Sequence, residues 1–129
     1  MELTESEALR AYARMMNTLD VQCLEGLLAE DFVYESQYVL EPLASKQAFL
    51  AYIEPKLQTI ARAKATVYAE MGTVDAYGGK QPCVILAQND KSNLVAVVLA
   101  KVEGGRLKRL DLCAVPPPEE AERSGEYPE

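Results

Sequence analysis

Hydroxyl groups are the side-chain chemistry that this chain offers most plainly. The sequence has seven tyrosines, no tryptophan and no histidine. Without histidine, the serine–histidine and cysteine–histidine pairs of hydrolases cannot form, and the usual general base near neutral pH is missing. A tyrosine hydroxyl instead donates or accepts hydrogen bonds, which suits ligand binding or stabilisation of a developing oxyanion.

The three cysteines lie far apart, and each is embedded in apolar sequence: Cys23, Cys83 and Cys113. No pair has the C-x-x-C spacing of a metal or redox site. This pattern is typical of small buried hydrophobic residues in a reducing compartment. We therefore expect no metal site, and the absence of a glycine-rich phosphate loop predicts no cofactor.

Tyr12 lies on the apolar stripe of the first predicted helix. Thr4 followed by Glu7 is a capping box, in which each side chain bonds a backbone N–H at the helix start. Leu9, Tyr12 and Met16 then recur at steps of three and four residues. The pattern predicts an amphipathic helix that directs Tyr12 toward the interior.

The spacing of apolar residues is mainly helical up to about residue 60 and is typical of strands from about residue 64 onward. Pro55 lies inside the third helical pattern and is expected to kink that helix. A loop over 37–44 is expected before that helix, and turns over 75–80, 89–93 and 103–105 are expected between the later strands. After the first helix, the sequence predicts a short helix at 20–30, a strand at 32–36, a helix at 46–60, and strands at 64–73, 84–88, 94–102 and 107–115.

This order predicts one α+β domain over residues 1–115, with three N-terminal helices packed on a curved antiparallel sheet. Such an arrangement leaves a conical pocket between the helices and the sheet. Residues 116–129 are acidic, rich in proline and poor in large apolar groups. Their composition predicts a disordered tail.

Charge and hydropathy exclude several partners. The 129-residue chain has a formal net charge of −7, whereas nucleic-acid binding needs a concentrated basic face. The nearest basic group is expected to be a solvated rim around one hairpin; it comprises Lys101, Arg106, Lys108 and Arg109. No segment approaches the roughly 18 consecutive apolar residues of a membrane span, and the acidic N-terminus lacks a signal-peptide pattern. We therefore expect a cytoplasmic protein without nucleic-acid or membrane partners.

The order of elements resembles the nuclear transport factor 2-like superfamily, which includes SnoaL-like proteins and ketosteroid isomerases. The resemblance covers about residues 4–115, and its most specific part is the helix-to-strand junction Leu27-Leu28-Ala29-Glu30-Asp31-Phe32-Val33-Tyr34-Glu35. It implies the cystatin-like cone fold, and family members commonly pair through the outer face of the sheet.

Ketosteroid isomerase provides the sharpest functional comparison. An ungapped overlay places Tyr12 where the isomerase has the tyrosine that hydrogen-bonds an oxyanion. The position of the isomerase's catalytic base is Ser36 here, and its second oxyanion donor falls near Val98. A hydroxyl without a basic neighbour cannot accept a proton at neutral pH. Ketosteroid isomerisation is therefore not expected.

Two other relatives depend on groups that this chain lacks or directs elsewhere. Scytalone dehydratase needs histidine, and limonene epoxide hydrolase uses an aspartate–arginine–aspartate network inside its pocket. The overlay directs Leu110 and Leu112 into the pocket, so that Arg109 and Asp111 lie on the outer face. A single β-bulge would reverse that assignment, which leaves the inward alternative open.

The same overlay gathers a candidate ligand site. With Ser36 directed inward, strand alternation also turns Tyr34 inward, Tyr12 faces them from the first helix, and Tyr52 reaches in from the third. We expect Tyr12, Tyr34, Ser36 and Tyr52 to bind a small, mostly apolar ligand with one or two polar handles. The alternative is that each tyrosine is a core residue with a backbone or water partner. Glu70 is expected to be exposed, although an inward orientation would make it a candidate base.

Three functions remain open at this point: a dimeric small-molecule-binding domain, a cofactor-free isomerase, dehydratase or hydrolase, and a protein-interaction module. No catalytic residue can be assigned. Because the strand at 94–102 is apolar on both sides, its outer face would expose an apolar patch. The sequence therefore predicts a homodimer through the sheet face.

Overall fold

The computed structural model describes residues 3–37, 41–76 and 78–129. Residues 38–40 of the predicted loop and residue 77 of the predicted turn lie outside the described residues. The helices are α1 (Glu5–Thr18), α2 (Gln22–Glu25), α3 (Lys46–Arg62) and the 3₁₀ helix η1 (Pro118–Glu120). The strands are β1 (Leu28–Ser36), β2 (Val67–Ala76), β3 (Gly79–Gln88), β4 (Leu94–Glu103), β5 (Arg106–Cys113) and β6 (Glu122–Arg123).

Helix α1 begins and ends as its sequence requires. Thr4 and Glu7 form the predicted capping box, with the Glu7 N–H donating to Thr4 Oγ1 at 3.1 Å. Leu19 closes the helix in the left-handed conformation at φ 59°. The predicted stripe is buried, with Leu9 and Tyr12 both shielded from solvent.

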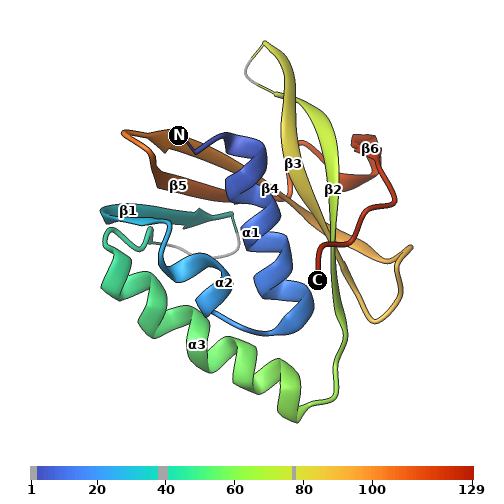
Figure 1. Cartoon of the computed structure of the whole chain (residues 1–129). Helices are drawn as coiled ribbons and strands as arrows, with labels where there is room; N and C mark the ends of the chain where they lie inside the picture. The colour runs from blue at the N-terminus through green and yellow to red at the C-terminus, as the bar shows by residue number, and fades with distance from the viewer. Residues whose placement is uncertain (1–2, 38–40, 77) are drawn as a thin grey trace.

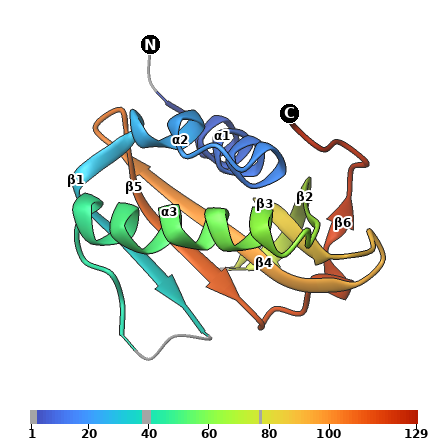
Figure 2. The ribbon, with the colours of Figure 1, turned by 90° about the horizontal axis from the view of Figure 1, so that it is seen from below.

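The six strands form one mixed sheet in the order β1-β5-β4-β3-β2-β6. Neighbouring strands are antiparallel except for β1, which pairs with β5 in parallel. Helix α1 packs on β2, β3 and β4, and α3 packs on β1, so both helices cover one face of the sheet. Figures 1 and 2 show α1 and α3 on this side. The α+β cone expected from the sequence is confirmed, with one parallel pairing in the sheet.

Several boundaries differ from the sequence-based prediction. The second helix ends at Glu25, and the first strand begins at Leu28 because Leu28 pairs with Leu107 on β5. Helix α3 continues through Pro55 as one helix, as predicted (Figure 2), but it ends at Arg62 rather than at residue 60. The strands β2 and β3 both extend toward their connecting turn, since their pairing continues to Ala76 and Gly79.

The sheet separates two apolar layers. The inner face, toward the helices, contributes the main core, including Val84, Leu86, Val98 and Leu110. The outer face, on the opposite side, carries a second buried cluster. We call this second set the outer cluster; it comprises Val74, Cys83, Ile85, Val97, Leu99 and Cys113.

The C-terminal residues cover the outer cluster, which corrects the expectation of a disordered tail. Helix η1 contacts β4, and its Pro118 is buried. Ala121 packs against the outer cluster, and β6 then pairs with β2 along the edge of the sheet (Figure 1). The tail has few large apolar groups, which suggested disorder, but composition does not reveal the backbone hydrogen bonds that order it. We call residues 116–129 the C-terminal strap.

The strap uses the hydrogen-bonding groups on the free edge of β2. The Met71 N–H donates to the Glu126 carbonyl at 2.9 Å, and the Ser124 N–H donates to the Met71 carbonyl at 3.2 Å. Ala69 lies two residues before Met71 on the same edge, and both its N–H and its carbonyl are bonded by the Asn17 side chain of α1. Asn17 also donates to the Pro128 carbonyl at 2.7 Å. An edge strand that would otherwise offer pairing groups to another chain is therefore occupied by its own polypeptide.

This arrangement changes the argument for a homodimer. Val97 and Leu99, expected to form an exposed patch, are 0% and 4% exposed beneath the strap. Among the described residues, Val115 is the one large hydrophobic side chain that is exposed. Homodimerisation stays a prediction, but a second copy would have to use another surface or displace the strap.

Candidate functional site

An inner cavity of about 460 Å³ opens between α3 and the inner face of the sheet. Its size is within the usual range for small-molecule sites. Its walls are mainly aliphatic; the larger apolar residues are Met16, Ile60, Leu86, Val67, Val95 and Leu112. Its polar lining comes from Ser36 at the end of β1, Tyr52 and Lys56 on α3, and Gln88 at the end of β3.

Strand register explains why these residues meet. Ser36 is the last residue of β1 and pairs with Leu112, while Tyr34 pairs with Leu110 two residues earlier. Because side chains alternate along a strand, all four share the inner face. Near the end of β3, a register irregularity follows Leu86, and both Leu86 and Ala87 line the cavity.

An aromatic row connects β1 with α3 beside the inner cavity. The Phe32 and Phe49 ring centroids lie 5.0 Å apart, and those of Tyr34 and Phe49 lie 5.2 Å apart. The row ends at Tyr52, whose ring centroid is 5.7 Å from that of Tyr34. These spacings are typical of favourable aromatic pairs, so the row holds the Tyr34 and Tyr52 hydroxyls in fixed positions.

The tyrosines of this region are neutral hydrogen-bonding groups rather than bases. Burial raises the pKa of Tyr12 well above its ordinary value, and the nearby Tyr34 and Tyr52 raise it further. Burial also raises the pKa of Tyr34, followed by the effect of Tyr52, whereas a hydrogen bond with Ser36 opposes the shift. Each of these two phenols therefore keeps its proton at neutral pH.

The structure brings the four predicted site residues into one region but gives them different access. Ser36 and Tyr52 line the inner cavity. Tyr12 and Tyr34 are 2% and 4% exposed and lie outside its lining. Their direct contact with a ligand stays a prediction; in this structure they support the residues that face the cavity.

Lys56 is a lining residue that the sequence analysis missed. It lies one helical turn after Tyr52, and its Nζ donates to the Tyr52 hydroxyl at 3.0 Å. The available signal was this i, i+4 spacing, which places both side chains on the same face of α3. Hydrophobic periodicity alone passes over such a lysine because it lies beside the apolar stripe rather than within it.

Glu70 is the one buried carboxylate among the described residues, and it lies on the outer face. Its Oε1 accepts from Arg123 Nε at 2.7 Å, and its Oε2 accepts from the Gly125 N–H at 2.7 Å. The expectation that Glu70 is exposed is therefore wrong, because the strap covers it. Its pairing with Ile85 of the outer cluster also shows that it cannot serve as a base in the inner cavity.

The arginine–carboxylate network also lies on the outer face, as the strand parity predicts. Val33 pairs with Arg109 and Glu35 with Asp111, on the side opposite to Tyr34 and Leu110. Arg109 Nε donates to both carboxylate oxygens of Asp111, at 3.0 and 3.1 Å, and its Nη2 donates to Glu35 Oε1. This network lines a second groove of about 300 Å³, which shares Ser36 and Leu112 with the inner cavity; Arg109, Asp111 and Glu35 do not line the inner cavity.

The buried thiols of Cys83 and Cys113 are poorly suited to nucleophilic chemistry. Burial, with a further contribution from Glu70, raises the pKa of Cys83 to about 12. Burial also raises the pKa of Cys113. A protonated thiol is a weak nucleophile and a weak metal ligand. Within 3–37, 41–76 and 78–129, no three histidine, cysteine or acidic side chains are grouped closely enough to hold a metal ion.

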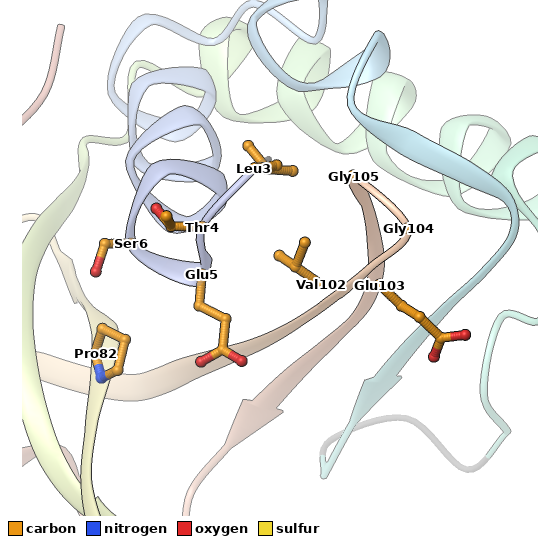
Figure 3. A pocket seen from close by; sticks show the side chains of 9 residues that line it. All are labelled: Leu3, Thr4, Glu5, Ser6, Pro82, Val102, Glu103, Gly104 and Gly105. Atoms are coloured by element: carbon orange, nitrogen blue, oxygen red, sulfur yellow. The ribbon is translucent and has the colours of Figure 1, made fainter. Parts of the chain in front are cut away.

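A third hollow, of about 410 Å³, lies between the start of α1 and the β4–β5 turn. Figure 3 shows Glu5 pointing into it beside Pro82 and Val102, with Gly104 and Gly105 at the turn. The hollow is open to solvent, and its charged side chains are the carboxylates of Glu5 and Glu103. It lacks the apolar enclosure of the inner cavity.

The comparisons with known proteins bear on the fold. No family model and no curated protein sequence matches this chain. A SnoaL-like protein of unknown function from Burkholderia thailandensis matches at a TM-score of 0.59, covering 97% of this chain and 100% of that chain. An NTF2-like protein of unknown function from Cytophaga hutchinsonii matches at 0.58, covering 90% and 96%. The chain has the nuclear transport factor 2-like fold.

Sequence identity to both structures is 15%, so the similarity concerns the fold alone. A third structure with this fold is the Orange Carotenoid Protein of Anabaena sp. PCC 7120 binding canthaxanthin. It matches at a TM-score of 0.62 and 17% identity, covering 93% of this chain and 39% of that chain. No helix in the described part of the present chain is long and apolar enough to cross a membrane.

Proposed function

We propose that this nuclear transport factor 2-like domain binds a small, mostly apolar molecule in its inner cavity and carries out no chemistry of its own. The observation that carries the proposal is the cavity itself. About 460 Å³ of space is walled mainly by aliphatic side chains, with a few polar groups among them. Burying an apolar ligand there would gain about 25 cal/mol per Å² of apolar surface removed from water.

The polar groups support binding over catalysis. The hydroxyls of Ser36 and Tyr52 can orient one polar group of a ligand, but neither is a base at neutral pH. The described residues lining the cavity include no carboxylate, and Glu70 is held by the strap on the opposite face. The carotenoid-binding structure with the same fold is consistent with an apolar ligand, although its 17% identity carries only the fold.

Filling the cavity provides the test. Ala96 lines it and is 1% exposed, so Ala96→Phe should occupy the space where a ligand would lie. Ala51→Phe, on the exposed side of α3, adds the same ring outside the cavity and serves as the matched control. The neutral probes are 2-naphthamide and decanamide, chosen for their different shapes, and binding is measured by calorimetry and by native mass spectrometry.

We expect at least one probe to bind the wild-type chain and Ala51→Phe with equal affinity, and Ala96→Phe to lose about tenfold or more. Native mass spectrometry of freshly purified protein should also show a retained small molecule that Ala96→Phe lacks. Equal probe binding by all three proteins, or none by any, would contradict a ligand site in the inner cavity.

A further inference from the structure

Lys56 adds a positive charge to the lining of the inner cavity, whose walls are otherwise mainly aliphatic. It is the one charged side chain among the described residues that line the cavity. The chain as a whole has 20 acidic residues against 13 basic ones. None of the ion pairs found among the described residues includes Lys56, although five other lysines and arginines are paired with carboxylates.

The ammonium group is oriented by its own helix. Lys56 Nζ donates to the Tyr52 hydroxyl at 3.0 Å and lies 5.3 Å from the centre of the Tyr52 ring. An ammonium group has three N–H donors, so two remain for other acceptors. The Tyr52 oxygen accepts from Lys56, and a hydrogen bond between Tyr34 and Tyr52 contributes to the raised pKa of Tyr34, so the Tyr52 hydroxyl belongs to a chain of polar groups that a ligand can join.

The cavity therefore has two unlike sides. Helix α3 and the end of β1 contribute the ammonium of Lys56 and the hydroxyls of Tyr52 and Ser36. The strands β2 to β4 contribute mainly aliphatic groups, including Val67 and Leu86, and one neutral amide, that of Gln88. A molecule that matches both sides has an apolar body and one head group that accepts several hydrogen bonds and carries negative charge.

We infer that the ligand class is an amphipathic carboxylate: an apolar aliphatic or aromatic acid whose carboxylate pairs with Lys56 and accepts from Tyr52. This inference rests on the proposed function, because it assigns the head group of a ligand in the same cavity. A carboxylate is favoured over a neutral head group because the Lys56 ammonium, exposed at the rim of the cavity, can make a charge-assisted hydrogen bond with it.

The test compares head groups on identical bodies. The probes are 2-naphthoate with 2-naphthamide, and decanoate with decanamide, titrated calorimetrically into the full chain at low ionic strength. Three variants accompany the wild type. Lys56→Met removes the charge and keeps an unbranched side chain, Lys56→Arg keeps the charge, and Lys46→Met removes a lysine of α3 that does not line the cavity.

We expect the wild type to bind each acid about tenfold more tightly than its amide. Lys56→Met should lose that preference with unchanged affinity for the amides, Lys56→Arg should retain most of it, and Lys46→Met should behave as wild type. A preference for the acids that survives in Lys56→Met would overturn the assignment. Equal wild-type binding of acid and amide would also overturn it while leaving the cavity as a ligand site. Absence of binding by all four probes would contradict the proposed function as well.

Discussion

The two faces of the sheet are both apolar, but they are covered in different ways. On the inner face, helices α1 and α3 bury the core and leave the inner cavity between α3 and the strands. On the outer face, the strap buries the outer cluster without any α-helix. The inner face presents hydroxyl and ammonium groups to an open space, whereas on the outer face the buried carboxylate of Glu70 is held in an ion pair with Arg123.

The element that covers each face of the sheet determines whether that face is fully packed or retains space for a ligand. Rigid helices cross the sheet at an angle and cannot follow its twist everywhere, so unfilled space remains at their edge. A strap follows the surface because its backbone groups bond directly to the edge strand. We therefore expect ligand binding to depend on the inner face and stability to depend strongly on the outer one.

Removing the strap should have the largest effect on this comparison. Deletion of residues 118–129 uncovers the outer cluster and leaves Glu70 without Arg123. We expect a loss of about 3 kcal/mol or more in the free energy of unfolding, measured by denaturant titration. The truncated chain should also self-associate in sedimentation experiments, because its exposed apolar face is open to a second copy. Unchanged stability and an unchanged oligomeric state would contradict the role given to the strap.

The Glu70–Arg123 pair should carry part of that effect. Arg123→Met leaves a carboxylate that is 3% exposed without its charged partner, which should cost about 2 kcal/mol at pH 7. Glu70→Gln in the same chain removes the buried charge, so the double variant should lose less than the sum of the single changes. Strict additivity in this double-mutant cycle would show that the pair is not coupled.

Gly72 tests how closely the strap approaches the sheet. A Cβ at Gly72 would lie 2.5 Å from the Glu122 carbonyl oxygen and 2.7 Å from Ile85 Cδ1. Gly72→Ala should therefore displace β6 and cost about 1–2 kcal/mol. Gly26→Ala is the control, because a Cβ there meets nothing within 4 Å. Equal thermal stability of the two variants would show that the strap adapts without cost.

The smallest expected change in stability concerns Tyr12 on the inner face, and part of it is seen only at alkaline pH. Because the folded pKa of Tyr12 is raised above its unfolded value near 10, the folded chain keeps a proton that the unfolded chain loses. This contribution to stability is complete below about pH 10 and is lost as the pH rises toward the folded pKa. Tyr12→Phe should cost about 1 kcal/mol at pH 7 and show a shallower decline in stability as the pH rises above about 10. Parallel declines in denaturant titrations would contradict the shift.

Much of the inner face was predictable from the sequence. The capping box at Thr4 fixed the start of α1, and hydrophobic periodicity placed Tyr12 on its buried stripe. Strand alternation predicted that Tyr34 and Ser36 face the helices, with Arg109 on the other side. These features depend on local spacing, which a single sequence contains.

The strap was not predicted, because its stability depends on pairings between distant residues. Its acidic, proline-rich composition is typical of a disordered tail. The overlooked signal lies on α1, where Arg10, Arg14 and Asn17 follow one another at helical spacing on the polar side. Arg10 pairs with Glu126, Arg14 Nε donates to the Glu129 carbonyl at 3.2 Å, and Asn17 donates to Pro128.

Methyl NMR during a titration tests the central claim most directly, because alternate residues of the same strands report on opposite faces. Leu86, Ala96 and Leu112 line the inner cavity, whereas Ile85, Val97 and Leu99 belong to the outer cluster beneath the strap. On addition of decanoate, we predict progressive shifts of the Leu86, Ala96 and Leu112 methyl signals, with the Ile85, Val97 and Leu99 signals unchanged. Shifts confined to the outer cluster, or of equal size on both faces, would contradict the account.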